Sequence, residues 1–265
     1  MDLNLGDRVL RVYDVGDGIP VFWHHGTPNL GLPPEPLFRP GVRWISYDRP
    51  GYGGSTPMPD RSVGSAATDI SHIADALGLT QFAVFGHSGG APHALACAAL
   101  LPDRVTAAVA GAPLAPFDAD GLDWFAGMVA SAEASLRAAA AGRAAKEQHE
   151  ASGVEYDMEF SEADLATLRG PWSWFGQVVE PALANGPGPL IDDDLAYVRP
   201  WGFDPASITA PTLLLHGDRD GITPPAHSQW LASRIPNAEL RLTPGDGHIS
   251  VLDHAESALD WLLAR

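Results

Sequence analysis

Short apolar runs that suit buried strands alternate along this chain with segments whose apolar residues recur at helical spacing. The clearest helical pattern covers 65–77 and stops at Gly78, a residue that commonly ends a helix. Predicted strands cover 8–13, 19–24, 42–47, 81–85, 105–110, 212–216 and 239–242. Other predicted helices cover 91–101, 225–233 and 249–263. This alternation predicts an α/β protein with a mostly parallel sheet and helices on both faces.

The pattern changes in the middle of the chain. No strand is predicted from 111 to 204, where an Ala-rich amphipathic stretch over about 125–148 precedes shorter helical pieces at 162–168 and 173–183. We therefore expect a core formed by 1–110 and 205–265. The intervening residues, 111–204, are expected to form an inserted helical cap over one end of the sheet.

Composition narrows the classes of partner. The chain has 265 residues, a formal net charge of -17 and a single lysine, Lys146, which argues against binding to nucleic acid phosphates. Cys97 is the only cysteine, so no intramolecular disulfide is expected. No apolar run approaches the ~18 residues that span a membrane, and the N-terminus lacks a basic, apolar leader pattern. We expect a cytoplasmic protein without membrane insertion.

Acidic residues gather at two places in the predicted cap. They are Glu155, Asp157 and Glu159, followed by the run Asp192–Asp194. The simplest interpretation is a solvated face. A carboxylate that points inward would instead bind a substrate amine.

The segment Gly86-His87-Ser88-Gly89-Gly90 lies between the predicted strand that ends at Phe85 and the helix 91–101. Glycines two residues before and after the serine allow a sharp turn, because they have no Cβ to clash. Such a strand–turn–helix context exposes the hydroxyl at the tip of the turn. Ser88 is therefore the candidate nucleophile.

A serine hydroxyl needs a base, and that base needs an orienting acid. His248 follows the last predicted strand and lies at the carboxyl edge of the sheet, where active residues of open α/β sheets gather. Asp218 and Asp220 both follow the strand 212–216 and are both candidates for the acid. Either aspartate would also suit an Asx turn in this Gly/Pro-rich loop.

Attack on a carbonyl also creates an oxyanion, which needs preorganised N–H donors. The backbone amide of Gly89 follows the nucleophile at a helix N-terminus and is the first candidate donor. The second is the amide of Thr27, in a loop after an early strand.

Taken together, these segments resemble the α/β-hydrolase superfamily. The matching motifs are His25-Gly26-Thr27-Pro28, Asp48 to Ser55, the Ser88 turn, Gly217-x-x-Asp220-x-x-x-Pro224 and Gly247-His248. The resemblance implies the α/β-hydrolase fold and favours Asp220 over Asp218. It implies a catalytic triad of Ser88, Asp220 and His248, an oxyanion hole of Thr27 and Gly89, and no metal or organic cofactor.

The resemblance is to the serine esterase-like members that carry a helical cap. Dehalogenases and epoxide hydrolases of this fold carry aspartate where Ser88 stands, so acyl chemistry on a carboxylic ester is expected. The alternatives are perhydrolysis of the haloperoxidase type, and thioester, lactone or carbon–carbon bond hydrolysis, although His87 stands where carbon–carbon hydrolases often carry asparagine. A non-catalytic ligand-binding protein on this scaffold is a further alternative.

Aromatic residues of the predicted cap are candidates for substrate binding. Trp124, Trp172, Trp174 and Trp201 would line a pocket for a small-molecule substrate, an apolar or aromatic ester. The alternative is that these side chains attach the cap to the sheet.

Overall fold

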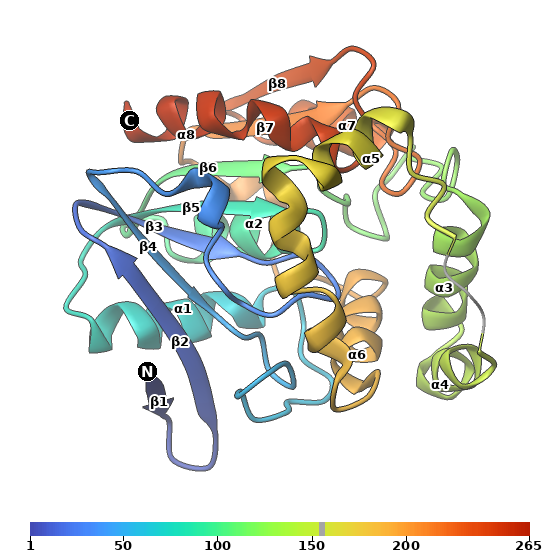
Figure 1. The fold of residues 1–265 in the computed structure, drawn as a ribbon, viewed down its shortest axis with the longest axis horizontal. Coiled ribbons are helices and arrows are strands. Elements are labelled where there is room, and N and C mark those ends of the chain that lie inside the picture. Colours follow the sequence, from blue (N-terminus) through green and yellow to red (C-terminus); the bar gives the residue numbers. More distant parts are fainter. Residues whose placement is uncertain (154–156) are drawn as a thin grey trace.

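The computed structural model describes residues 1–153 and 157–265 and contains one eight-stranded sheet (Figure 1). Its strand order is β1-β2-β4-β3-β5-β6-β7-β8. β2 pairs antiparallel with β1 and β4, and the remaining neighbours are parallel. The strands are β1 (Asp2–Asn4), β2 (Val9–Gly16), β3 (Ile19–His24), β4 (Val42–Tyr47), β5 (Phe82–His87), β6 (Val105–Gly111), β7 (Thr212–Gly217) and β8 (Ala238–Thr243).

Hydrophobic cores cover both faces of this sheet. Along β5, Phe82 and Val84 join one core, whereas Ala83 and Phe85 join the other, because successive side chains of a strand point to opposite faces. The first core lies under α1 (Ser65–Ala76), α2 (Gly90–Leu100) and α7 (Ala226–Arg234). The second lies under α8 (Ala255–Leu263) and the 3-10 helix η2 (Pro171–Gln177). The continuous apolar run of the strand follows from this two-sided burial.

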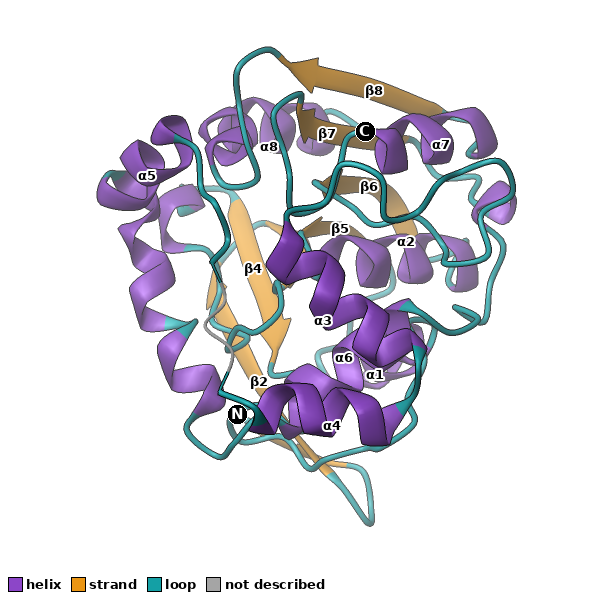
Figure 2. Cartoon of the chain, turned by 90° about the vertical axis from the view of Figure 1, so that its right-hand side faces the viewer, coloured by secondary structure: helices purple, strands orange, loops and turns teal. Residues whose placement is uncertain are grey.

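Between β6 and β7, the described residues form helices and loops and contain no strand. The helices are α3 (Ala130–Ala140), α4 (Arg143–Ala151), α5 (Glu162–Arg169), η2, η3 (Glu180–Leu183), α6 (Gly188–Tyr197) and η4 (Pro205–Ser207). We call this part, residues 112–211, the helical segment. Figure 1 shows α3 and α6 on the side toward which β5 and β6 run, and Figure 2 shows α3 and α4 in front of that edge.

The structure confirms the predicted α/β-hydrolase fold and refines several of its elements. The turn at Gly16–Gly18 joins β2 to β3, but β4 lies between these strands in the sheet. The stretch predicted at 125–148 forms two helices, since Gly142 has a φ of 110° and ends the first. The last helix is shorter than predicted, because the 3-10 helix η5 (Ser250–His254) precedes it. β1 and α6 have no counterpart among the predicted elements.

The prediction of a solvated face at Asp192–Asp194 is wrong. Asp193 is fully buried, and its two neighbours are 6% exposed. In α6, successive side chains point in different directions, and each carboxylate meets a cation. Arg143 pairs with Asp192, Arg49 and Arg61 pair with Asp193, and Lys146 pairs with Asp194. These cations lie far from α6 in the sequence, so the local pattern does not reveal the pairing.

The other predicted acidic group differs from that run. Asp157 and Glu159 are exposed, as predicted. Glu155 lies outside the described residues. Among the helices of the described residues, none is long and apolar enough to cross a membrane.

Candidate active site

Ser88 lies at a sharp turn between β5 and α2. Its φ of 55° is in the left-handed region that non-glycine residues rarely adopt, and its amide donates to Gly111 O of β6 at 2.8 Å. A Cβ at Gly86 would collide with Gly90 O, and a Cβ at Gly90 would collide with His24 O. Both glycines are therefore required by close backbone approach, and the turn holds the partly exposed Ser88 hydroxyl beyond the strand.

The structure brings Ser88, His248 and Asp220 together in one hydrogen-bonded chain. Ser88 Oγ lies 2.8 Å from His248 Nε2, and His248 Nδ1 lies 2.7 Å from Asp220 Oδ2. Because the ionised carboxylate only accepts, Nδ1 carries the ring proton and Nε2 is free to accept from Ser88. The arrangement suits transfer of the serine proton to the histidine.

Asp220 is held by several donors besides His248. The amides of Ile222 and Thr223 donate to Oδ1, and the Thr223 hydroxyl donates to Oδ2. His216 Nε2 lies 2.6 Å from Thr223 O and 3.2 Å from Asp220 Oδ2, so it carries a proton toward both. Burial raises the pKa of the Asp220 carboxyl, but His248 and His216 outweigh it and hold that pKa well below its usual range.

Asp218, the competing candidate, lies elsewhere. Its side chain is 41% exposed, and its Oδ1 accepts from the amide of Gly245 at 2.8 Å. This contact ties two loops at the carboxyl edge of the sheet. The geometry therefore agrees with the preference for Asp220 that the resemblance implies.

The loop that contains Thr27 lies directly beside the Ser88 turn. A Cβ built on Gly26 would lie 3.6 Å from Ser88 Cβ, and one built on Gly89 would lie 3.0 Å from Thr27 Cβ. Gly89 begins α2 as its N-cap. Thr27 and Gly89, the two predicted oxyanion donors, are therefore neighbours of each other, next to the candidate nucleophile.

His87 supports His248 from behind the turn. Its Nε2 lies 2.9 Å from His248 O, and because a carbonyl accepts, this nitrogen carries a proton. Burial lowers the pKa of His87 to about 3, so the ring is neutral near pH 7. The sequence places His87 next to Ser88 but does not reveal this contact across 161 residues.

Two carboxylates of the helical segment contact the candidate site, and the sequence analysis missed both roles. Asp164 of α5 accepts from the amides of Ile249 and Ser250, which follow His248. Asp193 of α6 pairs with Arg49 at 2.7 Å and accepts from the Thr27 hydroxyl at 2.7 Å. Since Asp193 is already neutralised by cations of this chain, it is not available to a substrate amine.

The four candidate tryptophans are buried, with exposed fractions of 2–5%. Trp124 and Trp201 belong to a cluster that the helical segment forms together with Val63 and Ala96. Their indole nitrogens donate to Ala115 O and Tyr197 O. Trp172 and Trp174 pack in the core beneath η2. These positions suit attachment of the segment to the sheet, the alternative that the sequence left open.

Among residues 1–153 and 157–265, no group of three or more His, Cys, Asp or Glu side chains is arranged to hold a metal ion.

The chain is similar in sequence and fold to known α/β hydrolases. The profile of a family described as the alpha/beta hydrolase fold matches residues 19–255. The 2-hydroxymuconate semialdehyde hydrolase of Pseudomonas putida is 30% identical, with 93% of this chain and 86% of that protein aligned. A non-heme haloperoxidase of Rhodococcus erythropolis is 29% identical, with 89% and 87% aligned. The solved structure of a thermophilic esterase from Thermogutta terrifontis covers 97% of this chain and 93% of its own, with 23% identity and a TM-score of 0.69, which shows a shared fold.

Proposed function

Because this chain belongs to the α/β hydrolase family, we propose that it is a serine hydrolase that cleaves a carboxylic ester or a related acyl substrate. The observation that carries the proposal is the continuous contact from Ser88 Oγ through His248 to Asp220, at 2.8 and 2.7 Å. Both distances lie within the range for direct proton transfer. Serine at the turn favours an acyl-enzyme intermediate over the alkyl ester that an aspartate would form.

In the proposed reaction, Ser88 Oγ attacks the substrate carbonyl carbon while His248 Nε2 takes the serine proton. The carbonyl oxygen becomes an oxyanion that accepts from the amides of Thr27 and Gly89. Collapse of this intermediate breaks the ester bond, and His248 returns the proton to the departing alcohol. Water then attacks the acyl group on Ser88 by the same route, which releases the acid and restores the serine.

Asp220 keeps His248 in the productive tautomer and stabilises its positive charge during each step. Its own proton affinity is low enough that it stays ionised throughout. His87 and Asp164 hydrogen-bond to the two ends of the peptide group that follows His248, its carbonyl oxygen and the amide of Ile249. This support limits the range of ring orientations, which favours proton transfer to and from Ser88.

We further propose that 111–204 acts as a cap that selects a neutral, apolar or aromatic small molecule. Buried cations near the Thr27 loop, Arg49 and Arg61, are both paired with Asp193. Because the two side chains are only 1% and 2% exposed, neither is open to an anionic substrate group. In this proposal the same tryptophan side chains would both line the pocket and pack the cap against the core. They are Trp124, Trp172, Trp174 and Trp201.

The relatives support two other uses of the same triad. One is named a hydrolase of 2-hydroxymuconate semialdehyde, which suggests carbon–carbon bond cleavage, and one a non-heme haloperoxidase, which suggests attack by peroxide on the acyl-enzyme. Thioester and lactone cleavage would pass through the same intermediate. All of these reactions share the attack by Ser88 and differ in the leaving group or the second nucleophile.

A panel of substrates that share one acyl group tests the proposal. The panel contains an aryl ester, an alkyl thioester, a lactone and a 1,3-diketone, with hydrogen peroxide added to the ester in a parallel arm. We expect the highest kcat/KM on the ester, and a loss of at least about 10³-fold in Ser88→Ala. Turnover of the diketone above the ester, or ester hydrolysis that survives in Ser88→Ala, would overturn the assignment.

A further inference from the structure

The hydroxyl of Tyr197 lies between the two chain segments that carry the proposed oxyanion donors. It is 2.7 Å from Thr27 Oγ1 and 2.9 Å from Gly89 O, to which it donates. A Cβ built on Gly89 would collide with the Tyr197 hydroxyl and lie 2.5 Å from Thr27 Oγ1. Three groups from distant parts of the chain therefore meet at one point beside Ser88.

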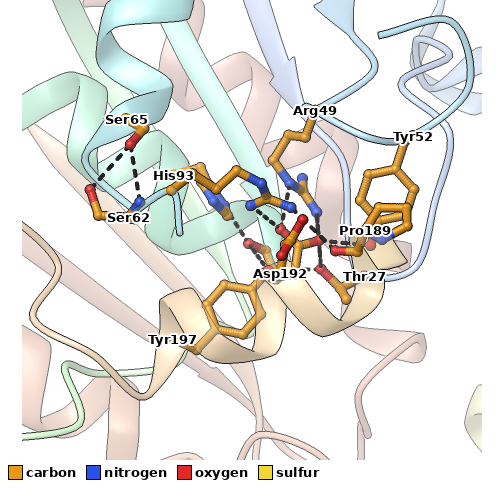
Figure 3. A network of polar contacts seen from close by, with 12 residues as sticks. Thr27, Arg49, Tyr52, Ser62, Ser65, His93, Pro189, Asp192 and Tyr197 are labelled. Carbon is orange, nitrogen blue, oxygen red and sulfur yellow. Dashed lines mark hydrogen bonds and ion pairs between the residues drawn. The ribbon is translucent and has the colours of Figure 1, made fainter. Parts of the chain in front are cut away.

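Helix α6 carries both the Tyr197 hydroxyl and the Asp193 carboxylate. Asp193 and Tyr197 are four residues apart, so they share one face of the helix. Asp193 accepts from Arg49, Arg61, the Tyr52 hydroxyl and the Thr27 hydroxyl, while Tyr197 contacts Gly89. Figure 3 shows Arg49, Tyr52 and Thr27 converging toward this helix.

The loop that contains Thr27 is held by the same cluster of side chains around Asp193. The Arg49 guanidinium donates to the carbonyl oxygens of His25 and Gly26 and to Thr27 Oγ1, and its backbone amide donates to His25 Nε2. Arg49 and Asp193 are 1% and 0% exposed. Because both charges are removed from water, their geometry is held tightly, and it sets the position of the Thr27 loop relative to α6.

The Gly89 side is held by two donors to one carbonyl. His93 Nδ1 lies 2.8 Å from Gly89 O and carries a proton toward it, and the Tyr197 hydroxyl donates to the same oxygen. The rings of His93 and Tyr197 also pack edge to face at 5.8 Å. The Gly89–Gly90 peptide group is therefore held partly from the core and partly from α6, and it adjoins the Ser88–Gly89 peptide group that carries the proposed donor.

We propose that Tyr197 is a positioning residue for the oxyanion hole: its hydroxyl donates to Gly89 O and lies 2.7 Å from Thr27 Oγ1, whose one proton is shared between Asp193 and the Tyr197 oxygen. Through these contacts Tyr197 helps to set the distance between the Thr27 and Gly89 amides. The inference rests on the proposed function, since it concerns a group that acts only once the oxyanion forms. It gives α6 a part in the machinery of the proposed reaction. Tyr197 itself does not touch the reacting atoms in this role.

The test compares Tyr197→Phe with Tyr52→Phe. Each variant loses one buried hydroxyl of the same cluster, but only the Tyr197 hydroxyl contacts Gly89. We expect Tyr197→Phe to lower kcat on an aryl ester by about 10- to 100-fold with KM changed less than about twofold. We expect Tyr52→Phe to keep kcat within about twofold of the wild type. Thermal melting of both variants serves as the measure of folding, and Thr27→Val replaces Tyr197→Phe if the latter does not fold.

A second readout separates positioning from packing. A trifluoromethyl ketone forms a hemiketal: the Ser88 Oγ–C bond forms, the serine proton passes to His248, and the ketone oxygen takes the negative charge. The matching secondary alcohol binds the same pocket without forming an oxyanion. We expect Tyr197→Phe to weaken binding of the ketone by the same factor as kcat, while binding of the alcohol stays within about twofold.

The outcomes distinguish the two proposals. If the wild type binds the ketone no more tightly than the alcohol, or Ser88→Ala keeps the difference, the proposed function itself is wrong. If the wild type shows the difference and Tyr197→Phe matches Tyr52→Phe in kcat and in ketone binding, the function stands and the role of Tyr197 is wrong. An equal loss of affinity for ketone and alcohol would likewise overturn the positioning role.

Discussion

The Asp164 carboxylate accepts a hydrogen bond of 2.8 Å from the backbone amide of Ile249, the residue after His248. The same oxygen accepts from the amide and hydroxyl of Ser250. Backbone bonds lower the pKa of Asp164 despite the opposing effect of burial, so the carboxylate is ionised at neutral pH. Helix α5 of the helical segment thus holds the loop that carries the proposed catalytic base.

Asp164→Ala is expected to lower kcat by about tenfold, because the loop after His248 loses three hydrogen bonds and the ring loses a fixed orientation. The variant should also be less stable by at least about 2 kcal/mol, since buried amides are left unpaired. Steady-state kinetics and urea unfolding measure the two effects.

Ser161→Ala is the matched control for that variant. Asp164 also forms the capping box of α5 with Ser161, so its removal costs the cap as well as the loop contacts. Ser161→Ala loses the cap, worth about 1 kcal/mol, and keeps the bonds to Ile249 and Ser250. Equal losses of kcat in the two variants would show that the loop contacts have no role in catalysis.

Asp220→Asn separates the two acid candidates. An asparagine preserves the shape but favours the wrong tautomer of His248, so kcat is expected to fall by about 10⁴-fold. Asp218→Asn changes a side chain that accepts from Gly245 and lies 3.7 Å from Arg219, away from His248, so kcat should stay within about threefold. Parallel kcat/KM measurements on one ester decide the matter, and a larger loss in Asp218→Asn would reverse the assignment.

The stability of the fold should fall as the pH drops below about 6.5. Burial lowers the pKa of His24 and His87 to about 3 and that of His227 to about 4, and it brings the pKa of His25 and His93 well below the ordinary value. Below pH 6.5, the unfolded chain binds protons that the folded one does not. Each such histidine then reduces the free energy of unfolding by up to about 1.4 kcal/mol per pH unit.

Urea unfolding between pH 5 and 8 measures this dependence. His227→Gln should make the slope of unfolding free energy against pH shallower by the contribution of one histidine, because burial keeps the His227 ring neutral in the fold while its Nδ1 accepts from Ala115 N. The exposed His72 provides a control, and His72→Gln should leave the slope unchanged. A His227→Gln curve parallel to that of the wild type would contradict the account.

Local sequence patterns were sufficient to predict strands β2 to β8 of the sheet and the loops that follow them. The Ser88 turn, the loop at Asp220 and the loop at His248 each follow a buried strand, and parallel strands bring their carboxyl ends to one edge. The topology alone therefore predicted that these three loops lie close together, without knowledge of any side-chain contact. The preference for Asp220 over Asp218 came from the resemblance, since the pattern of residues suited either aspartate.

The contacts of α6 and α5 could not be predicted in the same way. Asp193 and Arg49 are 144 residues apart, and Asp164 and Ile249 are 85 apart. In a chain of net charge -17, three successive aspartates are typical of a solvated surface. Only the fold shows that each of them faces a cation, because burial and pairing are tertiary properties.

Labelling of Ser88 tests the central claim most directly. The enzyme is incubated with a fluorophosphonate, and the adduct is located by intact-mass measurement and peptide mapping. We expect one adduct per chain, on Ser88, with none in Ser88→Ala and a rate lowered by at least about 10³-fold in His248→Ala. An adduct on another residue, or equal labelling rates in His248→Ala and the wild type, would contradict the proposed triad.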